Sequence, residues 1–295
     1  MSVRKYLVGL VGDGIGASLT PELHMREARR LGLDYDYRLL DLEAGEHDAS
    51  DLVDFLWRLA DEGYSAVNVT HPFKQRVLAS MDDLSPEARH IGAVNLVLFR
   101  DGRMHGHNTD WTGFRSALLQ DLAGEPRETV LQFGAGGAGL ATAYAVLSLG
   151  TASVVVHDVE VAHAKALADR YRPYFPEQTI TATNGSVDPW WESLDGVIHA
   201  TPLGMAHHPG MAFDPSRLAP NTWLAEVVYR PIETELLRKA RATGRRVLDG
   251  GPMAVGQAVD SLRLITGREP VPARMRADFQ ELLCEDADTR RAGPS

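Results

Sequence analysis

The stretch Thr129-Val130-Leu131-Gln132-Phe133-Gly134-Ala135-Gly136-Gly137-Ala138-Gly139 decides the fold of the second half of the chain. A short apolar run, typical of a buried strand, leads into glycines spaced G-x-G-x-x-G, and an alanine-rich helical segment follows to about Leu149. Such glycines allow a tight turn and let backbone amides approach a pyrophosphate at the helix N-terminus. This strand, turn and helix context predicts a Rossmann domain. We expect its dinucleotide to be bound by Gly134, Gly136, Gly137, Ala138 and Gly139.

The next predicted strand, Ser153 to His157, ends in Asp158, 24 residues after Gly134. An acidic residue at this position accepts hydrogen bonds from the adenosine ribose 2′-hydroxyl. A 2′-phosphate about 4 Å from that carboxylate would be repelled by ~4 kcal/mol per unit charge at an effective dielectric of 20, before screening. The following residues, 159–163, contain no arginine that could bind this phosphate. Asp158 therefore favours NAD over NADP.

Composition excludes several other classes of protein. The 295 residues suffice for two domains, and 44% hydrophobic with 24% charged residues is typical of soluble globular proteins. The net charge of −10 and the absence of a basic stripe argue against a nucleic-acid partner. No apolar run approaches the roughly 18 residues of a membrane helix, and the apolar start is broken at Gly12, too soon for a signal peptide. The single cysteine, Cys284, excludes an internal disulfide framework and fits a reducing cytoplasm, where we expect the protein to act.

The first third of the chain has its own α/β rhythm. Strands at Tyr6–Val11, Tyr35–Asp41 and Tyr64–Val69 are predicted to alternate with helices ending near Leu31 and Gly63. This pattern predicts a second α/β domain, followed by a Gly- and Pro-containing linker at 121–127. After Asp158, further strands are expected at 179–183, 197–200, 223–228 and 247–248, and helices at 234–243, 253–266 and 272–283.

Lys74 is the first candidate for proton transfer. Only four of the 30 basic residues are lysines, and Lys74 ends the segment Asn68-Val69-Thr70-His71-Pro72-Phe73-Lys74, directly after a predicted strand. Lysine changes its pKa readily when partly buried, whereas arginine keeps its proton. The alternative is that Lys74 is an ordinary surface charge at the start of a predicted helix, Gln75 to Met81.

Four other polar residues allow both a structural and a functional interpretation. Ser18 and Thr20 precede a helix with Pro21 in its first turn, where Thr20 could cap the helix or both hydroxyls could bind a small carboxylate. Asn95 is the single polar residue in the run 91–99, so it bonds either with the backbone or with a ligand hydroxyl. Asp110 stands before another helix as a cap or as a catalytic group. The histidines at 105, 107, 207 and 208 lack metal-ligand spacing, so we predict no metal site.

Taken together, the motifs resemble the shikimate dehydrogenase family, and within it the NAD-using quinate/shikimate dehydrogenases of actinobacterial type. The resemblance covers essentially the whole chain in the family's order. It rests on Ser18-Leu19-Thr20-Pro21, Asn68 to Lys74, Gly92-Ala93-Val94-Asn95, Asn108-Thr109-Asp110, Gly134 to Gly139, Ala200-Thr201-Pro202-Leu203-Gly204-Met205, Val228-Tyr229 and Gln257.

The resemblance implies a discontinuous substrate-binding domain, 1–113 with 252–295, around an NAD-binding Rossmann domain, 114–251, with the active site in the cleft between them. Lys74 and Asp110 would form the catalytic pair. Ser18 and Thr20 would bind the substrate carboxylate, and the ring would contact Thr70, Asn95, Tyr229 and Gln257. The remaining cofactor contacts would come from Thr201, Pro202, Met205, Val228 and Gly251.

The implied reaction is NAD-dependent oxidation and reduction at the C3 hydroxyl of shikimate and quinate, giving 3-dehydroshikimate and 3-dehydroquinate. Four residues depart from the family's usual pattern. Thr20 replaces serine, as in quinate-using relatives, and Asp158 replaces the Asn-Arg pair of NADP-dependent members. His199 replaces asparagine, and Gly256 replaces an aromatic residue or histidine. The biosynthetic or catabolic role stays open. A homodimer is one assembly that the sequence allows, and nothing in it decides the oligomeric state.

Two alternatives stay open. Gly256 would leave space beside Gln257 for a related substrate, so an aminoshikimate or aminoquinate dehydrogenase is one of them. The other is a non-catalytic sensor of cofactor and cyclitol acids, against which the intact Lys74 and Asp110 argue.

Overall fold

The computed structural model describes residues 4–42 and 52–292, and the chain divides into two compact units. Unit 1 contains Met1–Thr109 and Val255–Ser295, and unit 2 contains Asp110–Ala254. The predicted domain boundaries differ from these by a few residues. The segment 121–127, predicted to be a linker, lies inside unit 2, because the helix before it belongs to that unit.

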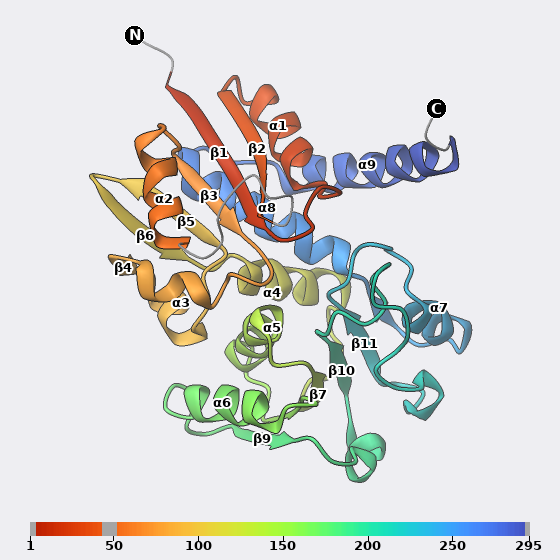
Figure 1. Cartoon of the computed structure of the whole chain (residues 1–295). Helices are drawn as coiled ribbons and strands as arrows, with labels where there is room; N and C mark the ends of the chain where they lie inside the picture. Colours follow the sequence, from red (N-terminus) through yellow and green to blue (C-terminus); the bar gives the residue numbers. More distant parts are fainter. Residues whose placement is uncertain (1–3, 43–51, 293–295) are drawn as a thin grey trace. The chain divides into compact units, whose positions relative to one another are not determined.

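Unit 1 is built on a six-stranded sheet in the order β2-β1-β3-β5-β6-β4 (Figure 1). Its first three strands are parallel, whereas β5 and β6 add to the sheet in antiparallel fashion and β4 pairs in parallel with β6. The strands are β1 Lys5–Gly12, β2 Asp34–Asp41, β3 Ala66–Val69, β4 Asp83–Leu84, β5 Leu96–Arg100 and β6 Arg103–His107. Apolar side chains on both faces form two separate clusters, so the sheet is covered on both sides.

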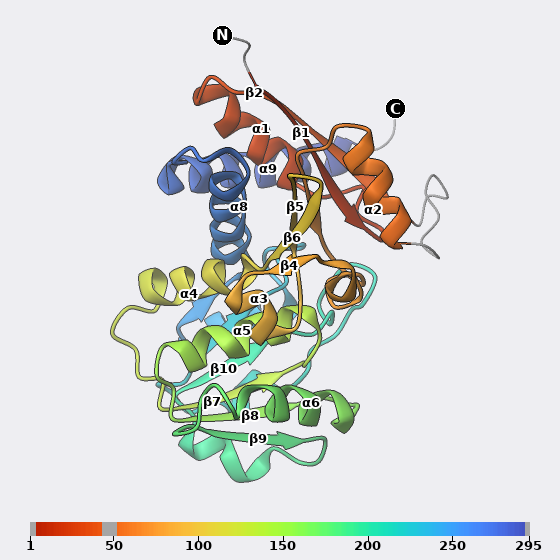
Figure 2. The ribbon, with the colours of Figure 1, turned by 90° about the vertical axis from the view of Figure 1, so that its left-hand side faces the viewer.

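The helices of unit 1 come from both ends of the chain. They are α1 Thr20–Arg30, α2 Leu52–Asp61, α3 Pro86–Ile91, the C-terminal part of α8 Gly250–Thr266, and α9 Pro272–Ala292. Figures 1 and 2 both show α1 and α9 side by side. Two local predictions were wrong in detail. The expected helix from Gln75 is a short 3₁₀ helix, η2 Arg76–Ser80, and Leu19 rather than Thr20 occupies the N-cap position of α1. The predicted start of the second helix near Ala49 lies outside the described residues.

Unit 2 is a Rossmann fold, as predicted. Its six strands are all parallel, in the order β12-β11-β10-β7-β8-β9. They are β7 Thr129–Phe133, β8 Ser153–His157, β9 Thr179–Thr183, β10 Gly196–His199, β11 Trp223–Glu226 and β12 Val247–Leu248. The helices are α4 Asp110–Asp121, α5 Gly137–Ser148, α6 Val161–Tyr171 and α7 Glu235–Ala242, with 3₁₀ turns η3 Asp188–Ser193 and η4 Pro215–Arg217. Figure 2 shows α5 and α6 on the same side of this sheet.

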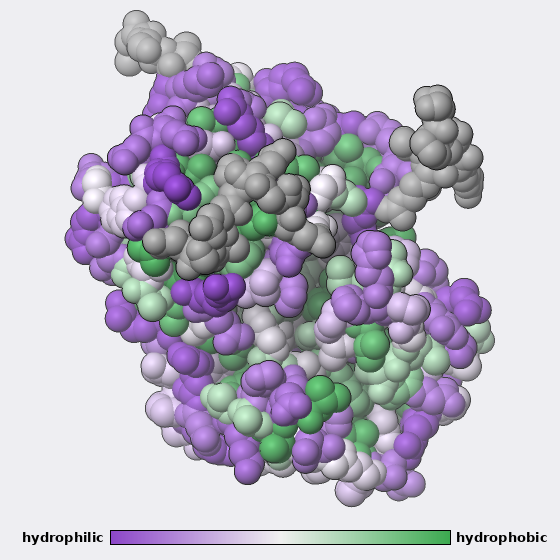
Figure 3. Space-filling view, viewed as in Figure 1, coloured by the Kyte–Doolittle hydropathy of each residue, from purple (hydrophilic) through white to green (hydrophobic). Residues whose placement is uncertain are grey.

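On the face shown in Figure 3, hydrophilic side chains predominate and hydrophobic ones lie between them. Among the described helices, none is long and apolar enough to span a membrane.

Candidate active site

The glycine loop after β7 is shaped by two close backbone approaches in unit 2. Gly134 has φ +98°, and a Cβ there would lie 2.5 Å from the carbonyl oxygen of Ala200. A Cβ on Gly139 would lie 2.3 Å from the carbonyl oxygen of Gly134. Any larger residue at either position would therefore displace the loop. Gly136 is the N-cap of α5 and has no such neighbour among the described atoms within 4 Å, so this helix N-terminus can be approached by a phosphate.

Gln132, which is not among the predicted site residues, holds this loop. Its buried amide group donates to the carbonyl oxygens of Gly134 at 2.8 Å and Gly139 at 2.9 Å. The hydroxyl of Thr142 donates to its side-chain oxygen at 2.8 Å. The signal was available, because Gln132 is the one strongly polar residue in the strand before the glycines.

Asp158 lies directly after β8, beside the glycine loop. Its Oδ2 accepts from the Ala135 amide at 2.9 Å and its Oδ1 from the Glu160 amide at 3.0 Å. The side chain is 13% exposed, and the imidazole of His163 lies 3.6 Å away. Each carboxylate oxygen retains acceptor capacity beyond these single bonds, which a ribose hydroxyl could use.

The other predicted cofactor residues follow neighbouring strands of the same sheet. Thr201, Pro202 and Met205 come after β10, Val228 comes after β11, and Gly251 lies in the first turn of α8 after β12. Because the strands are parallel, their carboxyl ends lie on one edge, where such sheets bind nucleotides. The structure thus places these segments on the same edge as the glycine loop. The predicted substrate residue Tyr229 follows β11 there as well.

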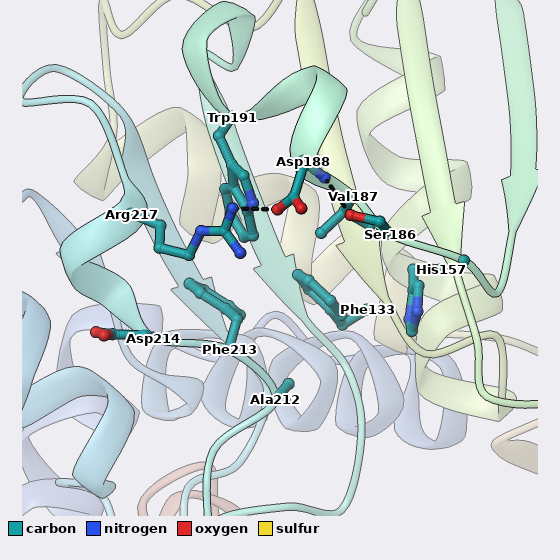
Figure 4. A pocket seen from close by; sticks show the side chains of 11 residues that line it. Phe133, His157, Ser186, Val187, Asp188, Trp191, Ala212, Phe213, Asp214 and Arg217 are labelled. Carbon is teal, nitrogen blue, oxygen red and sulfur yellow. Dashed lines mark hydrogen bonds and ion pairs between the residues drawn. The ribbon is translucent and has the colours of Figure 1, made fainter.

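A cavity of about 330 Å³ opens within unit 2 near the ends of β7 and β8 (Figure 4). Aromatic rings line it, and those of Phe133 and Phe213 stack with centroids 5.0 Å apart. Arg217 pairs with Asp188 at its rim and lies over the ring of Trp191. Arg217 and Asp188 thus satisfy each other's charge. The aromatic rings around them need no role beyond packing.

In unit 1, the loop between β1 and α1 carries Ser18, and Thr20 is the first residue of α1. Asp41, at the end of β2, fixes this loop by accepting from the amides of Gly14 at 3.0 Å and Ile15 at 2.8 Å. The hydroxyl oxygen of Ser18 accepts from the Thr20 amide at 3.3 Å. Ser18 therefore binds an amide at the start of α1, a role that we expected of Thr20, and the N-cap residue itself, Leu19, makes no side-chain cap bond.

The segment from Thr70 to Lys74 is held at both ends. The Thr70 amide donates to the Val11 carbonyl at 2.9 Å, and the Lys74 carbonyl accepts from the Val94 amide at 2.8 Å. Phe73 is buried in the core between them, while Lys74 is half-buried. The backbone around Lys74 is thus fixed by β1 and by the residues before β5.

Asn95 belongs to a buried polar network of unit 1. Its Oδ1 accepts from the Thr109 amide at 2.7 Å, and its Nδ2 donates to the Thr109 hydroxyl at 3.0 Å. That hydroxyl lies 3.0 Å from Ser261, which bonds with Asn68 at 3.1 Å. Asn95 thus bonds with a backbone amide, which is one of the two roles that we considered for it. The same network fixes Thr109, the residue directly before Asp110. The sequence did not predict this network, because it joins Asn68 and Thr109 to Ser261, which lies more than 150 positions further along the chain.

Two further predicted residues lie on helices. Asp110 is buried in the first turn of α4, at the start of unit 2, and Gln257 is half-buried on the part of α8 in unit 1. Among the described residues, no group of three or more His, Cys, Asp or Glu side chains could hold a metal ion.

Comparison with known proteins gives consistent matches over the whole chain. A model of the shikimate dehydrogenase substrate binding domain matches residues 10–97. A shikimate dehydrogenase (NADP(+)) of Streptomyces avermitilis is 50% identical over 287 residues, covering 96% of this chain and 97% of the relative. A quinate/shikimate dehydrogenase (NAD(+)) of Corynebacterium efficiens is 43% identical, covering 96% of this chain and 100% of the relative.

Among solved structures, the quinate dehydrogenase from Corynebacterium glutamicum in complex with NAD is 40% identical. It superposes with a TM-score of 0.83, over 94% of this chain and 99% of that one.

Proposed function

Because this chain belongs to the shikimate dehydrogenase family, we propose that it oxidises the C3 hydroxyl of shikimate and quinate with NAD. Apart from the four departures described above, the chain carries the motifs on which the family resemblance rests, and the catalytic proposal depends on one pair among them, Lys74 and Asp110. The bound nicotinamide would accept the hydride from C3. The protein must therefore handle the hydroxyl proton and hold the ring.

Lys74 is proposed to take the hydroxyl proton on its neutral amine as the carbonyl forms, and Asp110 is proposed to orient that amine and to stabilise the ammonium group that results. The structure supports a fixed position for Lys74, since the backbone on both sides is hydrogen-bonded and Phe73 is buried. It supports a fixed position for Asp110 through the network at Thr109. Precise positioning of this kind is what general acid–base catalysis needs.

Ser18 and Thr20 are proposed to bind the substrate carboxylate. The loop that carries Ser18 and leads into Thr20 is fixed by Asp41, and the Ser18 hydroxyl can still donate a hydrogen bond while it accepts from the Thr20 amide. The methyl group of Thr20 alters the space that the carboxylate must enter, which favours quinate as a second substrate. Thr70, Asn95, Tyr229 and Gln257 are proposed to contact the ring.

For the cofactor, the names of the relatives point both ways, and Asp158 is the residue that supports NAD. Both of its oxygens are held by backbone amides, so the carboxylate cannot easily turn away from an incoming ribose. A 2′-phosphate about 4 Å away would still be repelled by ~4 kcal/mol per unit charge at an effective dielectric of 20.

Steady-state kinetics on quinate and shikimate, each with NAD and NADP, test this proposal. We expect turnover of both acids and a higher kcat/KM with NAD. Binding of dinucleotide without turnover of either acid would refute the substrate assignment, and a preference for NADP would refute the role of Asp158.

Gly256 motivates a second candidate, an aminoshikimate or aminoquinate dehydrogenase. Comparing kcat/KM for amino and hydroxy substrates separates the two candidates, since a clear preference for the hydroxy acids removes the second. In either case, Lys74→Ala should abolish turnover while substrate still binds, which a non-catalytic sensor would not show.

A further inference from the structure

A buried chain of side chains links the ends of β10 and β11 in unit 2. Nδ1 of His199 lies 2.8 Å from Oε1 of Glu226, and its Nε2 lies 2.5 Å from the hydroxyl oxygen of Thr201. His199 and Glu226 are each 1% exposed. A carboxylate, an imidazole and a hydroxyl are thus connected in series next to a predicted cofactor residue.

The hydrogen bonds of Glu226 determine which ring nitrogen of His199 carries a hydrogen. Oε1 of Glu226 also accepts from the Val228 amide at 3.3 Å, and Oε2 accepts from the Thr234 hydroxyl at 3.3 Å. The Thr234 oxygen already accepts from the Leu237 amide, so its hydrogen is directed at Glu226. Since Glu226 acts as an acceptor throughout, Nδ1 of His199 carries a hydrogen, and Nε2 is left for Thr201.

The hydroxyl of Thr201 is thereby left with one free direction. A hydroxyl group can take part in three hydrogen bonds. One is used by His199, and a second is the Leu203 amide, 3.3 Å away, which donates to its oxygen. One further bond remains for a ligand. Held from two sides, the side chain cannot rotate without breaking a buried bond to His199 and leaving that nitrogen unsatisfied.

Glu226 also bonds with the predicted cofactor segment that follows β11, at Val228. It bonds directly with the amide of Val228 and indirectly, through His199, with Thr201. One carboxylate therefore connects the loops after two adjacent parallel strands, on the edge where nucleotides bind. Histidine suits this connection because its two ring nitrogens bond with partners on opposite sides. Asparagine, which is shorter, could bond with Glu226 but would not also reach Thr201.

We propose that His199 and Glu226 are positioning residues that hold the Thr201 hydroxyl for a hydrogen bond to the bound dinucleotide. This rests on the proposed use of a pyridine dinucleotide. His199 and Glu226 act through Thr201 and through the Val228 amide, and neither needs to touch the cofactor. The role is specific to a chain with histidine at position 199.

A double-mutant cycle on the whole chain tests the proposal. The Kd of NAD and of NADH is measured for each variant, by calorimetry or by the fluorescence of bound NADH. Thr201→Val, which keeps the shape and removes the hydroxyl, should weaken binding about fivefold to tenfold, the effect of one hydrogen bond. Glu226→Gln should weaken binding comparably. The double variant should bind little worse than the weaker single variant, because both changes remove the same contact. Thr201→Ser should keep the wild-type affinity.

Thr222→Val is the matched control. Thr222 is also buried in unit 2, but its hydroxyl donates to the Leu194 carbonyl at 2.8 Å and has no bond to the cofactor segments. The control should lose thermal stability without a change in Kd. If Glu226→Gln does not fold, His199→Asn takes its place in the cycle.

Additive losses in the double variant, or an unchanged Kd in Glu226→Gln or His199→Asn, would overturn the proposal. The titrations contain neither quinate nor shikimate. A protein that binds dinucleotide but oxidises neither acid would therefore refute the proposed function, while the cycle would still decide the role of His199.

Discussion

At the scale of single residues, Asp158 combines two tasks in one carboxylate. Its oxygens accept from the amides of Ala135 and Glu160, so it stabilises the glycine loop and the start of α6. In the proposed function, the same oxygens also accept hydrogen bonds from the adenosine ribose. A change here should therefore alter cofactor choice through charge and affinity through loop geometry, and an isosteric amide separates the two effects.

We predict that Asp158→Asn lowers the preference for NAD over NADP by at least about tenfold in kcat/KM. The amide removes the negative charge that would repel a 2′-phosphate by ~4 kcal/mol at close range, before screening. Asp169→Asn is the control, since Asp169 is another acid of unit 2, on α6, and its side chain is 70% exposed. Equal NAD/NADP ratios in Asp158→Asn and the wild type would show that another residue determines the cofactor.

At the scale of elements, strand β7 and helix α5 are joined by a turn that Gln132 holds from inside. Its amide bonds with the carbonyls at both ends of the glycine motif, and its oxygen accepts from Thr142 one turn into the helix. The glycines permit the turn, but Gln132 supplies the bonds that select one conformation of it. The loop should therefore be sensitive to a side chain that never meets the cofactor.

We predict that Gln132→Leu both destabilises the protein and weakens dinucleotide binding. Two carbonyl groups and one hydroxyl lose a buried partner, at about 1–3 kcal/mol for each group left unsatisfied. Urea unfolding and NADH titration would measure the two effects.

Gln178→Leu is a matched control for this change. Gln178 also donates to two carbonyls, those of Leu147 at 2.8 Å and Thr151 at 3.0 Å, at the opposite end of α5. The control should lose stability with an unchanged Kd. If both variants bind NADH normally, Gln132 has no role in forming the binding loop.

At the scale of the whole molecule, local motifs were predictable and long-range pairings were not. The glycine loop and Asp158 could be identified because their partners lie within about 25 residues and follow a known spacing. Ser261 meets Asn68 across 193 positions, and Val271 meets Glu27 across 244. No periodicity in the sequence specifies such partners. For the same reason, Asn95 and Ser18 could be identified as candidate polar residues from the sequence, but their hydrogen-bond partners could be assigned only from the structure.

The pairing of Glu27 joins the two ends of the chain within unit 1. This fully buried carboxylate of α1 accepts from the Val271 amide at 2.8 Å and from Arg274 at 2.6 Å. We predict that Glu27→Gln lowers the urea midpoint clearly more than Glu281→Gln, because a neutral amide weakens the charge-assisted bonds that the buried carboxylate accepts from Val271 and from the part-exposed Arg274. Glu281 is a suitable control, since its side chain lies exposed on α9 and also pairs with an arginine of α1, Arg26. Similar midpoints for the two variants would mean that α9 is held by apolar packing.

The stability of unit 1 should also depend on pH through His24. This fully buried residue of α1 bonds through Nδ1 with the Tyr35 hydroxyl at 3.0 Å, and its Nε2 has no hydrogen-bond partner among the described residues. Burial lowers the pKa of His24 from 6.5 to about 3. Below pH 6.5, His24 therefore binds a proton in the unfolded chain, whereas in the folded protein it stays neutral down to about pH 3. The free energy of unfolding thus falls as the pH falls through this window.

At pH 5, the histidine term should amount to ~2 kcal/mol relative to pH 7, from about 1.5 pH units at 1.36 kcal/mol each. We predict that His24→Gln, which cannot titrate, shows a shallower loss of unfolding free energy between pH 7 and pH 5 than the wild type. Both proteins retain His107, whose pKa is also lowered by burial, so the difference between their slopes isolates His24. Urea unfolding at a series of pH values measures it. Parallel curves for the two proteins would show that the imidazole becomes protonated without unfolding, by admitting water to Nε2.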